Sequence, residues 1–176
     1  MIFTETKIKG VYIIEPEPLT DERGFFARSF CKEEFRKQGL ETDIVQCNIS
    51  YNKKKGTLRG MHYQAAPHEE VKIVSCTQGS IYYVVVDLRR DSLTYLHWHG
   101  EVLSEDSHRI LYIPVGFASG FQTLKDDSVV FYQMGEFYHF ECTCGIRWND
   151  PAIGIIWPLS VEKIKEKDQK FPNFEY

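Results

Sequence analysis

The sequence GSIYYVVVDLRR, residues 79–90, contains the strongest β-strand signal in the chain. Side chains alternate between the two faces of a strand, so odd-numbered positions 81–87 share one face and even-numbered positions 82–86 share the other. Apolar or aromatic groups stand on both faces, which predicts a strand that is covered on both sides. Asp87 and the Arg-Arg-Asp sequence at 89–91 are expected to mark the exit of this strand into solvent.

Short β-rich runs continue in both directions from this strand. They cover residues 11–16, 43–50, 57–64, 71–78, 94–103, 109–114, 120–124 and 128–134. Polar turn-forming groups such as NKKKG (52–56) and KDDS (125–128) separate them. This rhythm predicts an all-β sandwich or barrel. Only residues 31–39, which end at a glycine, and the charged residues 159–168 favour short helices or turns.

Composition limits the function further. The 176 residues suit one compact domain, residues 1–176, and a hydrophobic share of 43% is ordinary for a globular protein. A net charge of −4 argues against a nonspecific nucleic-acid binder, which would carry a basic face. The N-terminal residues lack the apolar region of a signal peptide, and no stretch suits a membrane span. We therefore expect a cytoplasmic protein whose five cysteines are reduced thiols.

The segment GTLRGMHYQ, residues 56–64, carries the first candidate functional side chains. Arg59 and His62 would face opposite sides of a regular strand, so we expect a β-bulge at Gly60. Taken alone, this segment favours a histidine satisfied within a strand over a catalytic one. The other segments of the chain change that balance.

Seven segments, in one order, carry a resemblance to a known family. They are DERGFFARSF (21–30), LRGMHYQ (58–64), VKIVSCTQGSIYYVVVDLRRDSLTY (71–95), IPVGFASGF (113–121), VVFYQ (129–133), GIRWNDPAIGIIWP (145–158) and KEKDQKFP (165–172). In this register the chain resembles the dTDP-4-dehydrorhamnose 3,5-epimerases over nearly its whole length. The resemblance implies a cupin-type jelly-roll β-sandwich with a few short peripheral helices. It also implies an isomerase that epimerises a nucleotide-linked 4-keto-6-deoxyhexose at C3, C5 or both, without a cofactor.

The resemblance assigns a catalytic role to four residues. In the family, the residue at the position of His62 is the catalytic base, and the residue at the position of Asp168 is the carboxylate paired with it. Lys72 would place positive charge at the enolate oxygen, and Tyr132 would be the acid on the opposite face of the sugar. A 4-keto group acidifies the hydrogens on C3 and C5, and an imidazole that titrates near neutral pH can remove one. A carboxylate can hold the tautomer of that imidazole, and a cation stabilises developing negative charge. Local pattern alone would equally allow an exposed Lys72, a core Tyr132 and a solvated Asp168.

Other positions match the substrate-binding residues of the family. They are Arg23, Phe26, Gln46, Asn48, Arg59 and Tyr138. Arginines make forked, charge-assisted bonds to a diphosphate. Gln46 and Asn48 are two residues apart and would share a strand face, toward the sugar or on an exposed polar surface. The resemblance also implies a homodimer in which strands near the N-terminus extend the partner's sheet and help close its active site.

The match breaks at two positions. The family has G-F-A-H-G where residues 116–120 carry Ser119, and it has an acidic residue at the position of Tyr83. If the two positions are neighbours in the fold, Ser119 and Tyr83 jointly replace a His–acid pair. We hypothesise that this reshapes the sugar pocket and leaves the proton chemistry intact. The substrate, or the number of inverted centres, would then differ from that of the rhamnose pathway.

The sequence predicts no metal site. A metal-dependent cupin would need a second histidine close after His62 and another in place of Ser119. The Cys-Thr-Cys of residues 142–144 lacks the two-residue spacing of a zinc or redox pair. The His-Trp-His of residues 97–99 puts two imidazoles on one strand face, but no third ligand follows. His68, in the turn-like APHEE segment, is interpreted as a solvated residue.

Two other functions stay open at this level. A ketoisomerase of the same broad cupin group would move the carbonyl from C4 to C3, and a noncatalytic cupin would only bind a sugar nucleotide. Intact acid and base positions favour epimerisation, because a binding module has no need of a proton donor opposite a base. Epimerisation moves no hydride, which agrees with the lack of a Gly-rich dinucleotide fingerprint.

Overall fold

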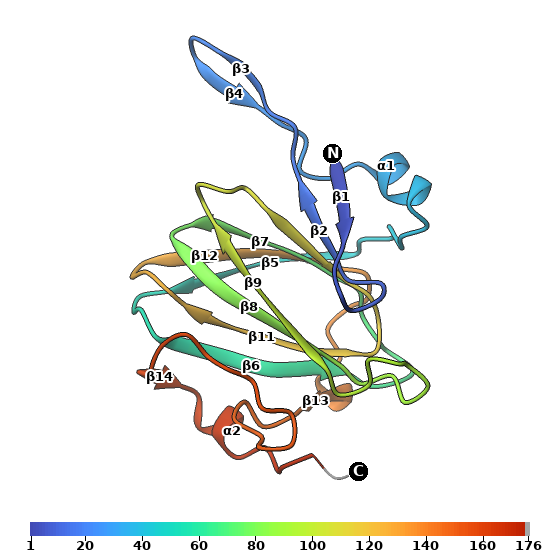
Figure 1. Cartoon of the computed structure of the whole chain (residues 1–176), viewed down its shortest axis with the longest axis vertical. Coiled ribbons are helices and arrows are strands. Elements are labelled where there is room, and N and C mark those ends of the chain that lie inside the picture. Colours follow the sequence, from blue (N-terminus) through green and yellow to red (C-terminus); the bar gives the residue numbers. More distant parts are fainter. Residues whose placement is uncertain (175–176) are drawn as a thin grey trace.

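A computed structural model describes residues 1–174 of the chain, and strands dominate it (Figure 1). The first sheet has the strand order β1-β2-β10-β7-β12-β5. Its strands are β1 (Ile2–Glu5), β2 (Tyr12–Glu15), β10 (Ile110–Ile113), β7 (Lys72–Gln78), β12 (Ser128–Met134) and β5 (Gln46–Asn52). All of its neighbouring strands are antiparallel.

The second sheet has the order β13-β6-β11-β8-β9, and these neighbours are also antiparallel. Its strands are β13 (Thr143–Gly145), β6 (Thr57–Gln64), β11 (Phe117–Thr123), β8 (Ser80–Asp87) and β9 (Trp98–Ser104). A short strand, β14 (Lys163–Ile164), adds to β6 in the parallel direction. It brings the C-terminal segment alongside β6.

The two sheets pack face to face around a shared apolar core. Val74 and Val130 contribute to this core from the first sheet, and Val85 and Phe121 contribute from the second. Strand β8 is covered on both sides, because its other face packs in a second cluster that includes Trp157. The predicted all-β sandwich and the two-sided covering of this strand are therefore confirmed.

Asp87 corrects one expectation, since it does not mark an exit into solvent. Its side chain is fully buried. Its carboxylate accepts hydrogen bonds from Arg89 Nη2 at 2.7 Å, Ser92 Oγ at 2.6 Å and Thr94 Oγ1 at 2.8 Å. The turn after β8 folds back over the strand end, and its polar groups make the burial of this charge tolerable.

The helices are short, as predicted. Helix α1 (Lys32–Lys37) ends before Gly39, whose φ of +73° suits a helix terminus, and its Phe35 packs on the outer face of the first sheet. Residues 159–168, expected to form a short helix or turn on the surface, contain the short strand β14 and the start of the short helix α2 (Glu166–Gln169). A 3-10 turn, η1 (Phe140–Cys142), lies between β12 and β13.

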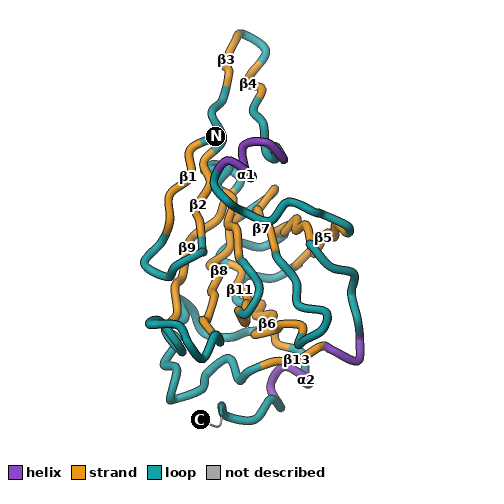
Figure 2. Tube along the Cα trace, turned by 90° about the vertical axis from the view of Figure 1, so that its right-hand side faces the viewer, coloured by secondary structure: helices purple, strands orange, loops and turns teal. Residues whose placement is uncertain are grey.

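A separate hairpin projects from the body of the molecule (Figures 1 and 2). It consists of β3 (Leu19–Asp21) and β4 (Gly24–Phe26), at the end opposite the C-terminal segment. Within residues 1–174, no helix has the length and apolarity that crossing a membrane would require.

Candidate active site

A cavity of about 850 Å³ opens between the two sheets. Every predicted site residue except Arg23 and Phe26 lines it. From the first sheet come Gln46, Asn48, Lys72 and Tyr132, from the second come Arg59, His62 and Ser119, and from later segments come Tyr138 and Asp168. The structure thus brings together side chains that the sequence spreads over more than a hundred residues.

His62 enters the cavity because β6 contains an irregularity where the sequence predicts a bulge. His62 lies opposite Ser119 of β11 and Arg59 lies opposite Phe121, so two residues of β6 stand against one of β11. Gly60 has a φ of +136°, and a Cβ atom there would lie 2.6 Å from the Cα of Gly120. The bulge turns both Arg59 and His62 to the cavity, which a regular strand would not do.

Asp168 is bound to His62 in the interior. Its Oδ1 lies 2.8 Å from His62 Nε2, and its side chain is 5% exposed. Burial raises the pKa of Asp168, but the hydrogen bond and charge of His62 and a bond from the Gly60 N–H outweigh it and leave the pKa lowered. An ionised carboxylate only accepts hydrogen bonds, so we assign the shared hydrogen to Nε2. Nδ1 of His62 is then free to accept a proton.

Lys72 and Tyr132 lie on the opposite wall, on strands β7 and β12 of the first sheet. Lys72 Nζ donates to Glu70 Oε1 at 2.6 Å, and the two side chains are 14% and 5% exposed. The other oxygen of Glu70 is buried and makes no hydrogen bond within residues 1–174. Glu70 lines the cavity, and sequence reasoning missed it because its neighbours in the APHEE segment suggest an exposed turn.

The amide residues of β5 share one face, as predicted. Gln46 Nε2 donates to Asn48 Oδ1 at 3.2 Å, and both side chains line the cavity. Gln46 Oε1 accepts a bond of 3.3 Å from the backbone N–H of Tyr138, whose ring is exposed at the rim. Arg59 is held by its Nε bond of 2.7 Å to Asn52 Oδ1.

Ser119 and Tyr83 are in contact on neighbouring strands. The Tyr83 hydroxyl donates to Ser119 Oγ at 3.1 Å, and both residues line the cavity and are buried. Burial raises the pKa of Tyr83 far above its usual value, so this phenol stays neutral. The pair presents two neutral hydroxyls to the cavity.

Three lysines of the C-terminal segment also line the cavity: Lys163, Lys165 and Lys167. All three are exposed, and together with Arg59 they make this mouth of the cavity positive. Sequence reasoning treated their segment as a solvated charged surface. The two-residue spacing of these lysines was the one sequence signal that could have predicted a shared direction for their side chains.

Arg23 and Phe26 lie apart from the cavity, on the projecting hairpin. Arg23 is 84% exposed and makes a forked ion pair with Asp21, and Phe26 is 72% exposed. Within one chain the structure does not bring these two predicted binding residues to the site.

The remaining histidines differ in their surroundings. In the 97–99 segment, His99 is partly buried beside Glu101, and burial lowers its pKa. His68 corrects the interpretation of a solvated side chain. It is partly buried, and its ring stacks on that of His139.

Comparison with known proteins identifies the family of the chain. The family model for dTDP-4-dehydrorhamnose 3,5-epimerase matches residues 5–176. The chain belongs to this family. The protein is therefore an isomerase, and its β-sandwich is the cupin-like fold of its structural relatives.

Individual relatives cover nearly all of this epimerase. The dTDP-4-dehydrorhamnose 3,5-epimerase of Methanothermobacter thermautotrophicus is 44% identical, over 96% of this chain and 92% of the relative. A crystal structure of a Legionella pneumophila 3,5-epimerase in complex with dTDP-4-keto-L-rhamnose is 34% identical, with a TM-score of 0.89 and 99% of both chains covered. A 3'-monoepimerase of Streptomyces bikiniensis, in complex with dTDP-quinovose, is 29% identical, with a TM-score of 0.89 over 96% of this chain and 85% of that chain.

Proposed function

We propose that this protein epimerises a dTDP-linked 4-keto-6-deoxyhexose at C3, at C5 or at both carbons. The observation that carries the proposal is the position of His62 and Tyr132, which line one cavity from opposite sheets. Inversion of a carbon needs a base on one face of the sugar and an acid on the other. A sugar ring held between the two sheets meets both groups.

The reaction follows from the contacts of these side chains. Nδ1 of His62 removes a proton next to the keto group, and the electron pair of the C–H bond passes to the carbonyl oxygen to give an enolate. Asp168 stabilises the imidazolium so formed, and Lys72 stabilises the enolate oxygen. Tyr132 then gives its phenolic proton to the opposite face of the carbon, and proton exchange with solvent restores both residues. Glu70 acts as a positioning residue, because its ion pair fixes Lys72.

The nucleotide diphosphate binds at the positive mouth of the cavity. Arg59 offers a planar fork that matches phosphate oxygens, and its bond to Asn52 leaves nitrogens other than Nε for the ligand. Lys163, Lys165 and Lys167 add charge on the same side. Gln46 and Asn48 offer amides to the sugar from the other wall.

The active form is a homodimer in which the hairpin of one protomer closes the cavity of the other. On the hairpin, the exposed fractions of Leu19, Phe25 and Phe26 are 72%, 53% and 72%. Such a group of exposed apolar side chains is unfavourable in solvent and is typical of an interaction surface. It also carries Arg23, whose guanidinium suits a phosphate. A deoxysugar pathway in the cytoplasm, toward surface polysaccharide, is the setting that we infer.

Ser119 and Tyr83 set the choice of substrate or the number of inverted centres. Two neutral hydroxyls cannot offer the charge that a His–acid pair would offer to the sugar, so one face of the pocket differs from that of the family pattern. Family relatives include a 3'-monoepimerase, which shows that single-centre activity exists on this fold.

Hydrogen exchange in D2O, followed by NMR with dTDP-4-keto-6-deoxyglucose, tests the proposal. Deuterium at C3 and C5 together with inversion of both carbons by the wild type, all lost in His62→Ala, indicates two-centre epimerisation. Deuterium at one carbon supports the role of Ser119 and Tyr83, and a Ser119→His/Tyr83→Asp variant is then expected to gain exchange at the second. No exchange with any nucleotide-linked 4-keto sugar would overturn the proposal in favour of a binding protein.

A further inference from the structure

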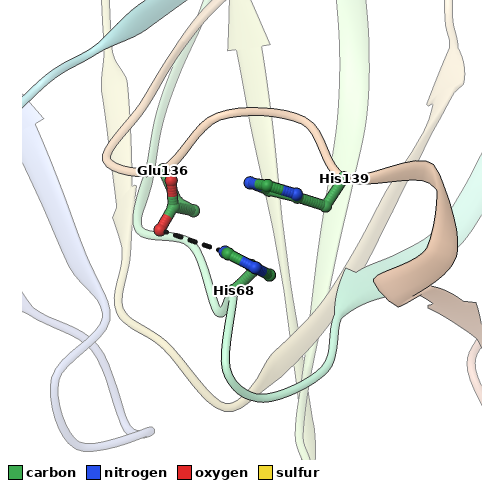
Figure 3. A group of neighbouring side chains, drawn as sticks. All are labelled: His68, Glu136 and His139. Carbon is green, nitrogen blue, oxygen red and sulfur yellow. Dashed lines mark ion pairs between the residues drawn. The ribbon is translucent and has the colours of Figure 1, made fainter.

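A second group of side chains with metal-binding chemistry lies outside the cavity. His68, Glu136 and His139 each offer one ligand atom, and these atoms all lie within 4.8 Å of one another (Figure 3). None of the three lines the cavity between the sheets. His68 belongs to the segment between β6 and β7, whereas Glu136 and His139 follow β12.

The three side chains lie next to one another. The imidazoles of His68 and His139 stack with ring centroids 3.4 Å apart and an angle of 13° between the planes. Figure 3 shows that each ring presents a nitrogen on the side where Glu136 lies. His68 Nδ1 is 3.5 Å from Glu136 Oε2, and this buried nitrogen makes no hydrogen bond within residues 1–174. A buried ring nitrogen without a hydrogen bond calls for an explanation.

A buried amide joins the two segments that carry the group. Gln64 Nε2 donates to the carbonyl oxygens of His68 at 2.9 Å and Phe137 at 3.1 Å. Gln64 Oε1 accepts a bond of 2.6 Å from the backbone N–H of His139. One side chain therefore fixes the backbone next to all three ligand residues, so little backbone freedom is left to lose on binding an ion.

The ligand types match a divalent transition metal. Two imidazoles and one carboxylate, with an open position for water, form a ligand set that Zn²⁺ accepts. Glu136 Oε1 accepts a hydrogen bond of 2.7 Å from the Phe137 N–H, and Oε2 lies on the side of His68. His139 Nδ1 lies 3.3 Å from Glu141 Oε1, and such a carboxylate behind a histidine orients the other ring nitrogen toward a metal.

We propose that His68, Glu136 and His139 form a binding site for one Zn²⁺ ion per chain. The ion ties the segment between β6 and β7 to the segment after β12. The proposal does not depend on the proposed epimerase reaction, because none of the three residues belongs to the cavity.

Calorimetric titration of the chelator-treated protein with Zn²⁺ at neutral pH tests the site. We expect one ion per wild-type chain and at least tenfold weaker binding in His68→Ala, His139→Ala and Glu136→Gln. His97→Ala is the matched control, because His97 is an exposed histidine outside the group. The affinity of this variant for Zn²⁺ should equal that of the wild type. Cys142→Ser is a second control, since this free thiol closely follows His139 and could capture zinc by itself.

A second measurement covers variants that fold poorly. Zn²⁺ is expected to raise the melting temperature of the wild type, Cys142→Ser and His97→Ala, and to leave that of Glu136→Gln unchanged. Absence of binding by the wild type, equal binding by wild type and Glu136→Gln, or loss of binding in Cys142→Ser would overturn the proposal. In the first case the stacked histidines and Glu136 form only a polar cluster.

Discussion

The buried carboxylate of Asp168 is hydrogen-bonded to His62, and this contact gives the first prediction for a single residue. Asp168→Asn keeps the shape of the side chain, but it removes the charge that stabilises the imidazolium and favours the wrong tautomer. We expect kcat to fall about 10²–10⁴-fold in a turnover assay. Glu166→Gln is the control, because Glu166 lies on the same helix and is exposed. An unchanged kcat in Asp168→Asn would remove Asp168 from the mechanism.

Glu70 gives the second prediction at this scale. Its ion pair with Lys72 is almost wholly buried, so removal of the carboxylate leaves an ammonium group without compensation. We expect Glu70→Gln to lower the free energy of unfolding by about 3 kcal/mol in urea titrations. The double variant Glu70→Gln/Lys72→Met, which has no charge to bury, should recover part of this loss. If Glu70→Gln unfolds like the wild type, the pair contributes nothing to stability.

At the scale of elements, the bulge in β6 depends on Gly60. Gly60→Ala puts a Cβ atom against Gly120 and strains a backbone of φ +136°, which costs about 1–3 kcal/mol from strain alone. The variant is expected to lose both stability and activity, because His62 follows the bulge. Gly39→Ala separates the two causes, since its φ is +73° but nothing lies within 4 Å of the added atom. Comparable thermal unfolding of the two variants would show that the overlap with Gly120 is unimportant.

The turn after β8 gives a prediction about pH. Burial raises the pKa of Asp87, but hydrogen bonds from Arg89, Ser92 and Thr94 outweigh it and lower the pKa to about 2. Since the folded pKa lies below the unfolded value of about 3.9, Asp87 stabilises the protein above pH 4, and this contribution disappears as the pH falls toward 2.

The test compares wild type and Asp87→Asn in denaturant unfolding across this range. We expect a difference of about 3 kcal/mol at pH 7, which narrows as the pH falls from 4 to 2. A difference that stays constant between pH 7 and pH 2 would mean that the ionised carboxylate is not the stabilising group.

At the scale of the whole molecule, the hairpin predicts cooperation between two chains. Arg23→Ala and Phe26→Ala are expected to lower kcat/KM at least tenfold without changing the fold of the chain, because both side chains are exposed. Mixing Arg23→Ala with inactive His62→Ala should raise the activity above that of either variant alone, since one cavity of the mixed dimer then has both His62 and Arg23. Sedimentation provides the control for dimer formation. No recovery in proven mixed dimers would place the hairpin outside the partner's site.

Much of the fold could be predicted from the sequence, because its signals are local. Alternation in residues 80–87 predicts a strand covered on both sides, and the positions of Arg59 and His62 predict the bulge at Gly60. The errors concern side chains whose surroundings come from distant segments. The turn that follows β8 buries Asp87, and the segment carrying His139 covers His68. No local pattern contains that information.

The candidate site divides in the same way. The family resemblance identified His62, Lys72, Tyr132 and Asp168, and the structure brings all four to one cavity. Glu70 and the three lysines at 163, 165 and 167 were missed, because their direction depends on how the C-terminal segment and the β6–β7 connection wrap around the sandwich. From their charge alone, such residues are predicted to be exposed to solvent.

If His62 and Tyr132 act on one carbon from opposite faces, proton removal and inversion can be separated by replacing one residue at a time. In D2O, Tyr132→Phe should incorporate deuterium next to the keto group without inversion, because His62 can return a deuteron to the face it attacked. His62→Ala should incorporate none. Inversion by Tyr132→Phe at the wild-type rate, or deuterium incorporation by His62→Ala, would contradict the account.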